Sequence, residues 1–587
     1  MTKDIYQLLH KYFGYKEFRS GQEEAIKSII NKQSTVVVLP TGGGKSLIYQ
    51  LSALALEGVT IVISPLISLM KDQVDSLNEL KIPATYINSS LSLMESEKRL
   101  EGIKNNEYKL IYIAPERFYN QNFITALQNI KVSLFAIDEA HCISQWGHDF
   151  RPSYMRLKQV VKNIGNPVIA ALTATATPEV RKDIAKQLDL GDDYNLVISG
   201  FARENLHFGA VEASDWQKNS LIIDAVKGVE GGSGIVYVGT RSKAEELMES
   251  LIAEGIQAAT YHAGMDASSR EWVQDNFLNN NIQVVVATNA FGLGINKKDV
   301  RFVIHHDIPG TLEAYYQEAG RAGRDGKTSF CLLFFSPKDR YLREFFIKGD
   351  NPSPQTIAEI HEILLDFSCE KETKIIMFTY ADLVSRLSES ISEMAVGTSI
   401  KILEKEGFIQ RNKEKNGAAY LKALAKDNEL KDAVSSRAKK QHEILDKLLD
   451  NYYDEFKEGW SFSIEDLATN LNVKKDSVSR LIKNLQEQDL VEYKPPFKGT
   501  ELEIINDTSN VSDKIDFRVL EEKLQKSYEK LDKMENYVYN VFCRQKYILE
   551  YFGDPEIKDC GKCDNCMKAN RSMKKGDIDY REKEYLI

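Results

Sequence analysis

No apolar run in this 587-residue sequence reaches the roughly 18 to 20 residues that a membrane-spanning helix needs. The first residues, MTKDIYQLLHKYFGY, are amphipathic but lack the basic region, the apolar stretch and the small-residue cleavage site of a secretory signal. We therefore expect a chain without membrane partners that works in the cytoplasm.

An excess of basic charge is also missing. The chain has 76 Lys and Arg against 86 Asp and Glu, a formal net charge of −10, which argues against a protein that coats nucleic acid through overall basicity. Any contact with nucleic acid must come from local basic grooves. The length favours about three to five domains, and 43% hydrophobic residues suit several buried cores.

Cysteine is scarce and unevenly placed. The isolated cysteines are Cys142, Cys331 and Cys369, and the clustered ones are Cys543, Cys560, Cys563 and Cys566. In a reducing compartment the cluster, with its two overlapping C-x-x-C steps, predicts a metal site, and four thiolates suit tetrahedral zinc with no open position for water. An iron–sulfur cluster remains an alternative, because it uses the same ligands.

From about residue 34 to 340, short β-rich runs alternate with helical patterns. The runs are TVVVLP, TIVISPL, KLIYIAP, LFAIDEA, VIAALTA, GIVYVGT, AATYHAG, VVVATNA and RFVIHHD. This alternation predicts an α/β fold with buried parallel strands and crossover helices. We expect two tandem domains, residues 1–200 and 201–350, with a junction within 191–205.

After about residue 350 the strand signal fades, and a weak internal repeat appears. SISEMAVGTSIKILEKEGFIQR and NVKKDSVSRLIKNLQEQDLVEYK each place an amphipathic helix before a short strand, and each follows another short helix. We interpret them as winged-helix modules at 351–430 and 431–515. A helical zinc-binding subdomain at 516–570 and a flexible tail at 571–587 complete the predicted order.

The second repeat carries a basic helix that includes Arg480, followed by a wing near Tyr493 to Lys498. The other polar residues of this helix are Lys474, Lys475, Ser477, Ser479 and Lys483. Such a face can contact DNA, but it can equally be a solvated surface or bind a protein.

VVVLPTGGGKSLIYQL combines a strand, a glycine turn and a helix start. Backbone N–H groups in such a turn converge on phosphates, so Thr41, Gly42, Gly43 and Gly44 are predicted to cradle ATP. Lys45 would reach the β and γ phosphates, and Ser46 would hold Mg²⁺. Leu39 stands where the common phosphate-binding loop has its first glycine. A glycine turn without a ligand is the alternative.

LFAIDEAH follows a later apolar strand, so its acidic pair should emerge at the sheet edge beside the glycine turn. Asp138 can position Mg²⁺ through water, and Glu139 can orient and deprotonate the attacking water. A solvated acidic helix start is the alternative for this motif alone.

QEAGRAGRDG lies at the far end of the second α/β block. Gln317, Arg321 and Arg324 are predicted to sense ATP bound to the first domain, with both arginines on one helix turn aimed at the γ-phosphate. In VVVATNAFGLGIN, the turn from Thr288 and Asn289 to Gly294 is predicted to contact a nucleic-acid strand. Surface ion pairs are the alternative for the arginines. Together these motifs indicate an ATP-driven nucleic-acid motor.

The motifs resemble those of superfamily 2 helicases and, more narrowly, of the RecQ family of DNA helicases. FGYKEFRSGQEEAI is similar to the RecQ adenine-recognition motif, which implies that Tyr15 stacks on the base, Arg19 lies nearby and Gln22 bonds its edge. HCISQWGHDFRPSY is similar to the RecQ aromatic-rich loop, and the cysteine cluster is the third likeness. The resemblance implies two RecA-like domains.

The aromatic loop also has a physical interpretation of its own. Trp146, His148, Phe150 and Arg151 offer π faces and a guanidinium on which unpaired bases can stack. Alternatively, Trp146 and Phe150 fill the core between the domains.

The resemblance implies an ATP-, Mg²⁺- and Zn²⁺-dependent helicase that moves 3′ to 5′ on single-stranded DNA and opens forked duplexes, with single-strand-binding protein or a topoisomerase as partners. About 165 residues, near 351–515, depart from the family's plan by separating motor from zinc segment, and no helical accessory (HRDC) domain is expected. An RNA helicase, or a winged-helix regulator with a vestigial motor, are the rival hypotheses.

Overall fold

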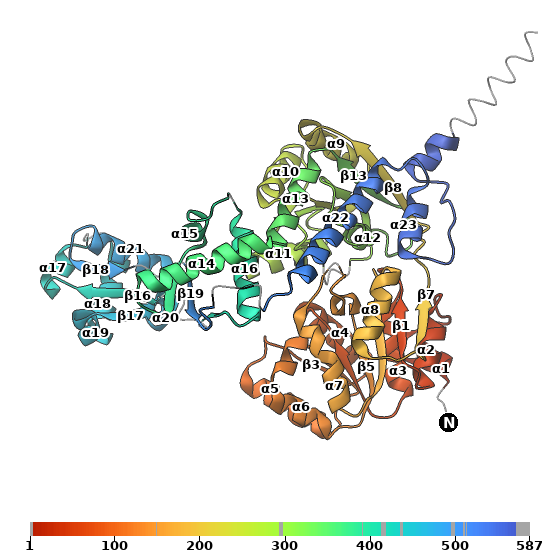
Figure 1. The fold of residues 1–587 in the computed structure, drawn as a ribbon, viewed down its shortest axis with the longest axis horizontal. Helices are drawn as coiled ribbons and strands as arrows, with labels where there is room; N and C mark the ends of the chain where they lie inside the picture. The colour runs from red at the N-terminus through yellow and green to blue at the C-terminus, as the bar shows by residue number, and fades with distance from the viewer. Residues whose placement is uncertain are drawn as a thin grey trace, which may run out of the picture. The chain divides into compact units, whose positions relative to one another are not determined.

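The computed structural model describes residues 4–147, 149–229, 231–292, 297–389, 391–411, 418–434, 438–494, 499–508, 511 and 514–570. The chain divides into two compact units, residues 1–344 with 525–587 and residues 345–524 (Figure 1). Helices α13 (Asp339–Asp350) and α22 (Phe517–Tyr539) each carry the chain across a boundary between the units. Within these described ranges, no helix is both long and apolar enough to cross a bilayer.

The first part of the larger unit, here called lobe 1, is built on a seven-stranded parallel sheet in the order β3-β4-β2-β5-β6-β1-β7. Its strands are β1 (Thr35–Val38), β2 (Val59–Ile63), β3 (Ala84–Ile87), β4 (Leu110–Ile113), β5 (Val132–Ile137), β6 (Val168–Thr173) and β7 (Asn195–Ile198). The central strands are apolar along their whole length because both faces are covered: Val36 and Val38 enter one core and Val37 the other.

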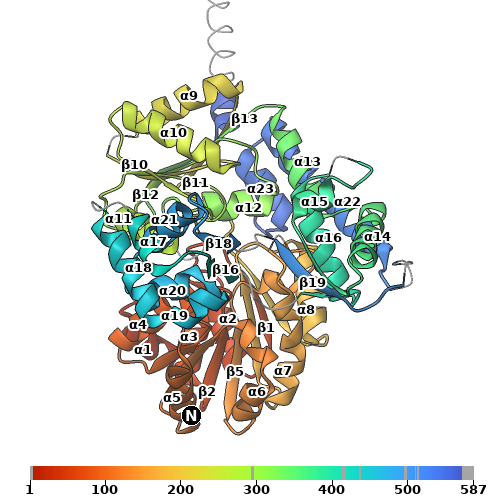
Figure 2. The same ribbon diagram turned by 90° about the vertical axis from the view of Figure 1, so that its left-hand side faces the viewer.

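Helices cover both faces of this sheet (Figure 2). One face carries α1 (Ile5–Leu8), η1 (Leu9–Phe13), α2 (Gln22–Ile30), α3 (Lys45–Ala55) and α4 (Ile67–Glu79). The other carries α5 (Leu93–Lys104), η2 (Pro115–Tyr119), α6 (Gln121–Gln128), η3 (Ala140–Ile143), η4 (Pro152–Arg156), α7 (Leu157–Asn163) and α8 (Pro178–Leu188). Capping fixes several of these helix starts, as where the Thr177 side chain accepts a hydrogen bond from Val180 N.

The second part, lobe 2, repeats the plan with a six-stranded parallel sheet in the order β10-β11-β9-β12-β13-β8. Its strands are β8 (Leu206–Glu212), β9 (Ser233–Tyr237), β10 (Ala258–Tyr261), β11 (Val284–Ala287), β12 (Val300–His305) and β13 (Ser329–Phe335). Its helices are α9 (Asp215–Lys227), α10 (Arg241–Ala253), α11 (Ala267–Leu278) and α12 (Leu312–Ala319), with α13 after the last strand.

These two sheets confirm the predicted α/β fold with tandem parallel-sheet domains. Each of the nine predicted strand runs holds a strand, whereas β3, β7, β8 and β13 were not among them. Strand β7 lies inside the predicted junction of 191–205 and pairs with β1 at the edge of the first sheet. The connection between the lobes is therefore the shorter segment 199–205, here called the interlobe linker.

The smaller unit holds two helical modules, each with a three-stranded antiparallel sheet. Module 1 joins α14 (Pro354–Glu370), β14 (Ile375–Phe378), α15 (Tyr380–Val384), α16 (Glu393–Lys405), β15 (Ile409–Arg411) and β19 (Thr500–Ile504) in one core. Module 2 joins β16 (Ala418–Ala423), α17 (Asp427–Asp432), α18 (Lys439–Asn451), α19 (Tyr453–Glu458), β17 (Trp460–Ser463), α20 (Ile464–Asn470), α21 (Lys475–Gln486) and β18 (Val491–Lys494).

The structure divides this stretch differently from the predicted boundary near residue 430. The strand β16, which falls within the predicted first module of 351–430, lies between β17 and β18 in the second sheet. The first sheet is completed instead by β19, which lies between β14 and β15 and follows module 2 in the chain. Module 2 is thus inserted between two paired strands of module 1.

The larger unit is completed by the second half of α22, by α23 (Arg544–Phe552) and by the cysteine cluster. Helix α22 falls in the helical stretch predicted between Asp516 and Cys543. Cys543 is the N-cap of α23, and its sulfur accepts a hydrogen bond from Lys546 N.

Candidate functional site

The glycine turn between β1 and α3 adopts a conformation that side chains would prevent. Gly42 and Gly44 have φ angles of 80° and 79°, the left-handed region that glycine enters without strain. A Cβ on Gly43 would stand 2.9 Å from Pro40 O, and one on Gly44 would stand 2.3 Å from Gln22 Nε2. Helix α3 begins at Lys45, so its N-terminal N–H groups face the turn, as phosphate binding requires.

The predicted adenine-recognition residues lie beside this turn. Gln22 Nε2 donates to Gly43 O and Gly44 O, both at 3.2 Å, and Arg19 donates to Gly42 O at 2.5 Å. Tyr15 is 55% exposed, which leaves its ring free for a base. Because Arg19 and Gln22 contact the turn, binding of a base beside them would be coupled to the conformation of the phosphate loop.

The acidic pair lies at the carboxyl edge of the same sheet. Asp138 follows β5, is 6% exposed and accepts a hydrogen bond from Glu139 N at 3.0 Å. Burial, reinforced by the neighbouring Glu139 carboxylate and opposed by Lys45, raises the pKa of Asp138 to about 7. His141 Nδ1 lies 3.3 Å from Glu139 Oε2 and 2.9 Å from Thr173 Oγ1, which ties this carboxylate to the end of β6.

These residues suit a magnesium ion. A buried carboxylate with a second carboxylate beside it lacks full countercharge, and Lys45 supplies only part of it. Hard oxygen ligands of this kind are those that Mg²⁺ prefers. Ser46 and Asp138 would hold the ion, and the ion would supply positive charge that offsets the charge of the phosphates.

Arg324 from lobe 2 reaches the glycine turn of lobe 1. It lies so close that a Cβ on Gly42 would stand 3.6 Å from its Cγ. Burial, followed by the nearby guanidinium groups of Arg321 and Arg203, lowers the pKa of Arg324 to about 10. Clustered cations of this kind favour an anionic ligand.

Arg321 departs from the expected arrangement. Helix α12, which holds Gln317, ends at Ala319, so the two arginines lie in the turn that follows the helix and not on one helix turn. The Arg321 guanidinium is buried and donates to Gly292 O within lobe 2. Its Nη1 is therefore engaged by the main chain of the loop after β11, within lobe 2.

The two lobes enclose a pocket of about 300 Å³ beside the glycine turn. It is lined from lobe 1 by Arg19, Pro40, Thr41, Gly42 and Gly43, from the interlobe linker by Arg203 and Asn205, and from lobe 2 by Gly323, Arg324, Asp325 and Gly326. Three arginines around this one space make it a candidate triphosphate site shared by both lobes.

The predicted strand-binding turn follows β11. Thr288 is half-buried, with its N–H donating to Tyr261 O, and Asn289 is exposed. The segment 293–296, including Gly294, lies outside the described residues. Arg321 donates to Gly292 O of this turn, so the turn is linked to the segment after α12 that carries Arg321 and Arg324.

The aromatic-rich loop is held against helix α22. The Lys526 ammonium lies 3.5 Å from the Trp146 ring centroid, and Lys530 donates to Trp146 O at 2.6 Å. Lys530 also lies 3.1 Å from the Glu313 carboxylate of lobe 2. Phe150 is half-buried, and Arg151 donates to Asp149 and to Pro65 O. His148 lies outside the described residues.

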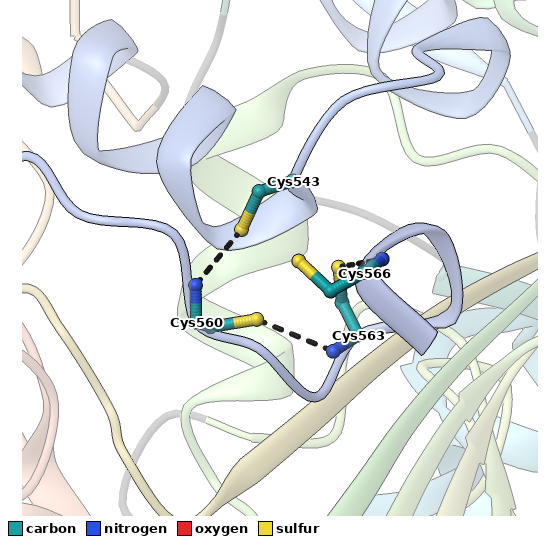
Figure 3. A group of neighbouring side chains, drawn as sticks. All are labelled: Cys543, Cys560, Cys563 and Cys566. Atoms are coloured by element: carbon teal, nitrogen blue, oxygen red, sulfur yellow. Dashed lines mark hydrogen bonds between the residues drawn. The ribbon is translucent and has the colours of Figure 1, made fainter. Parts of the chain in front are cut away.

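The four clustered cysteines converge from α23 and the segment after it (Figure 3). Their sulfur atoms all lie within 4.8 Å of one another, as expected for ligands of one ion. Main-chain N–H groups of Cys560, Cys563 and Cys566 donate to sulfurs of the cluster at 3.2–3.4 Å. Hydrogen bonds led by that from Cys560 lower the pKa of Cys563 to about 5, which favours the thiolate that zinc requires.

Arg480 lies on α21 in module 2 and is exposed. Nearby, Lys475 forms an ion pair with Glu465, so part of this helix's charge is already neutralised. Residues 495–498, most of the predicted wing, lie outside the described residues.

Sequence reasoning missed Arg203, Asn205 and the two α22 lysines. The linker sequence FAREN carried a weak signal, because Arg203 and Asn205 are two positions apart and would lie on the same face of an extended segment. Nothing in the sequence around Lys526 and Lys530 distinguishes them from other surface lysines.

Comparison with known proteins agrees with this geometry. Residues 19–184 match the DEAD/DEAH box helicase model, residues 217–326 the helicase conserved C-terminal domain and residues 505–567 the RecQ zinc-binding model. The ATP-dependent DNA helicase RecQ of Bacillus subtilis is 53% identical over 343 residues, which cover 58% of each chain. RecQ of Pasteurella multocida is 44% identical over 64% of this chain and 59% of its own.

The match to a shorter relative decides the family. The probable ATP-dependent DNA helicase RecS of Bacillus subtilis is 38% identical over 412 residues, which cover 69% of this chain and 82% of that protein. This chain belongs to the RecQ family. The zinc-binding model, together with the four converging sulfurs, assigns its cysteine cluster to zinc, not to iron and sulfur.

Coverage of the relatives is partial. The matched part of this RecQ-family chain spans somewhat under three fifths of the Bacillus subtilis and Pasteurella multocida RecQ proteins. Residues 327–504, between the second and third matched segments, contain nearly all of the smaller unit.

Proposed function

We propose that this chain is an ATP-dependent DNA helicase that moves along single-stranded DNA from 3′ to 5′ and opens forked duplexes in recombination or repair. One observation carries the proposal: a pocket of about 300 Å³ between two parallel-sheet lobes, with the glycine turn on one side and Arg324 on the other. Loss of the γ-phosphate would remove the anion that both lobes grip, so hydrolysis would change their spacing.

The residues divide the work between them. Lys45 and the turn would hold the phosphates, Glu139 would orient the attacking water and accept its proton, and Arg324 would offset charge as it develops. His141, whose Nδ1 lies 3.3 Å from Glu139 Oε2, would keep this carboxylate in place. The turn after β11 and the aromatic-rich loop would bind the single-stranded DNA.

A cytoplasmic location belongs to the same proposal, as do contacts with a single-strand-binding protein or a topoisomerase. Family resemblance supports these partners, and affinity measurements with the purified proteins would test them.

Strand displacement tests the activity directly. Forked duplexes with either a 3′ or a 5′ tail are mixed with the protein, with and without ATP, and we expect displacement from the 3′ tail with ATP only. The variant Lys45→Ala should lose at least about 100-fold in turnover because the phosphates lose their cation. Unwinding by that variant would refute the assigned chemistry.

Comparing oligo-dT with oligo-U as ATPase activators separates DNA from RNA substrates. We expect the DNA to stimulate more strongly. Equal or stronger stimulation by oligo-U would favour an RNA helicase, and no turnover with either would favour a DNA-binding regulator with a vestigial motor.

A further inference from the structure

The interlobe linker places one arginine between the two halves of the nucleotide pocket. Arg203 Nη1 donates to Thr41 O of the glycine turn at 2.9 Å and to Gly320 O of lobe 2 at 3.2 Å. Its Nη2 donates to Ala322 O at 2.9 Å and Gly323 O at 3.1 Å. The planar guanidinium of Arg203 therefore joins the phosphate loop to three carbonyl groups of lobe 2. Those of Gly320 and Ala322 flank Arg321, and that of Gly323 directly precedes Arg324.

Asn205 strengthens the lobe 2 side of this junction. Its Nδ2 donates to Gly323 O at 2.7 Å and to Lys327 O at 2.8 Å, so it holds the turn that carries Arg324 from both ends. The turn also touches the phosphate loop directly, since a Cβ on Gly320 would stand 3.2 Å from Thr41 Cβ. The arginine turn thus has little freedom to move while these bonds last.

The linker itself is fixed by the zinc-binding segment. Phe201 stacks on Phe552 with ring centroids 5.1 Å apart and planes 4° apart, and its N–H donates to Asp554 Oδ2 at 3.2 Å. Tyr316 of α12 donates to Phe201 O at 2.6 Å. On the other side of Arg203, the Lys562 ammonium donates to Glu204 O. The backbone that presents Arg203 is therefore held on both sides.

We propose that Arg203 is a positioning residue for ATP hydrolysis, which sets the Arg324 turn against the phosphate loop and transmits the position of the zinc-binding segment to the nucleotide pocket. The inference rests on the proposed function. The Arg203 guanidinium acts through main-chain carbonyl groups, so its contribution to ATP hydrolysis depends on its planar, forked shape as well as on its charge. Although Arg203 lines the pocket, its two Nη atoms already donate to four main-chain carbonyl groups, so we expect ground-state nucleotide binding to depend mainly on the glycine turn and Lys45.

Two substitutions test this role. Arg203→Ala removes the fork, and Arg203→Lys keeps the charge but has one nitrogen in place of two, so it cannot reach all four carbonyl groups at once. With single-stranded DNA present, we expect kcat for ATP to fall about 10- to 100-fold in both variants, part of the value of an arginine finger, while KM and the affinity for a fluorescent ATP analogue change less than about threefold. Glu204→Gln, a change at the exposed neighbouring position, is the matched control and should behave as the unchanged protein.

Two kinetic results would overturn the positioning role of Arg203. A kcat for Arg203→Lys within about twofold of the unchanged protein would show that charge suffices and would overturn the positioning role. A rise in KM with unchanged kcat would overturn it as well, because that pattern indicates uniform binding. Should Arg203→Ala fail to unfold cooperatively, Arg203→Lys and Asn205→Ala decide by the same kcat criterion. Lys45→Ala, assayed in parallel, separates the two claims: turnover by that variant contradicts the proposed function, not this inference alone.

Discussion

Arg321 and Arg324 stand three residues apart, yet their guanidinium groups have different surroundings. Arg324 lines the interlobe pocket next to Gly42, whereas Arg321 is buried within lobe 2 and donates to Gly292 O. Equivalent spacing in the sequence therefore corresponds to two tasks. One arginine lines the pocket proposed for the nucleotide, and the other bonds the turn that follows Thr288 and Asn289.

Single substitutions should separate these tasks. Arg324→Ala should lower kcat for ATP by at least about 100-fold, because a charge next to the phosphates is lost, while affinity for labelled oligo-dT stays unchanged. Arg321→Ala should lower kcat and also weaken oligo-dT binding, because Gly292 loses its support. Steady-state ATPase and fluorescence anisotropy measure both quantities. Identical profiles for the two variants would contradict the division.

At this scale, the sequence predicted the residues that belong to compact motifs. Lys45, Asp138 and Glu139 could be placed because a strand, a turn and a helix start determine the position of each side chain locally. The orientation of Arg321 could not, since its partner lies 29 residues away in another loop. The role of Arg203 could not be predicted for the same reason, because its four carbonyl partners come from two lobes.

Helix α22 connects elements that the sequence leaves unrelated. Lys526 covers the Trp146 ring and pairs with Glu179 of α8, and Lys530 joins the aromatic-rich loop to Glu313 of α12. A cation over an aromatic face contributes about 0.5 to 1 kcal/mol when partly exposed. Stacking of a DNA base contributes about 1 to 3 kcal/mol. A base can therefore displace Lys526 from Trp146.

Removing this lysine should help DNA to bind. We expect Lys526→Ala to bind oligo-dT about two- to fivefold more tightly than Lys533→Ala, because the base no longer displaces a cation. Lys533 is exposed on the same helix, so the pair is matched for lost charge. Anisotropy titrations at two salt concentrations measure the difference. Weaker binding by Lys526→Ala than by the control would show that the lysine contacts DNA and does not compete with it.

Local elements were predictable where their periodicity was strong. The helices α16 and α21 fall within the two repeats because their apolar residues recur at helical spacing. The partners of the short strands that follow were not predictable. Ile409 of β15 pairs with Ile504 of β19, and Tyr420 of β16 pairs with Lys494 of β18, and such distant pairings leave no mark on local patterns.

The arrangement of the whole smaller unit follows from these pairings. Strands β15 and β19 are antiparallel neighbours, and all of module 2 lies between them in the chain. The core of module 1 includes Leu502 and Ile504 of β19, both buried. Module 1 is therefore complete only when the chain has returned from module 2.

Two deletions should behave oppositely. Replacing residues 412–499 by Asn-Gly leaves a four-residue loop, Asn-Gly-Thr500-Glu501, between the paired residues Arg411 and Leu502, and so rejoins β15 to β19 as a hairpin in the native register. We expect a protein whose motor melts within about 3 °C of the original and still hydrolyses ATP. Deleting residues 431–515, the sequence-based second module, removes β19 and should expose the module 1 core and cause aggregation. Thermal unfolding and gel filtration compare the two. Equal solubility would contradict the insertion of module 2 within module 1.

The double passage of the chain between the two modules has a mechanical consequence. A domain that is joined by one polypeptide segment can rotate about the single bonds of that segment. A domain that is joined by an outgoing and a returning segment resists rotation, because rotation would wind the two segments around each other. A load applied to module 2 is therefore delivered to module 1 as torque through both β15 and β19, the edge and the centre of its sheet.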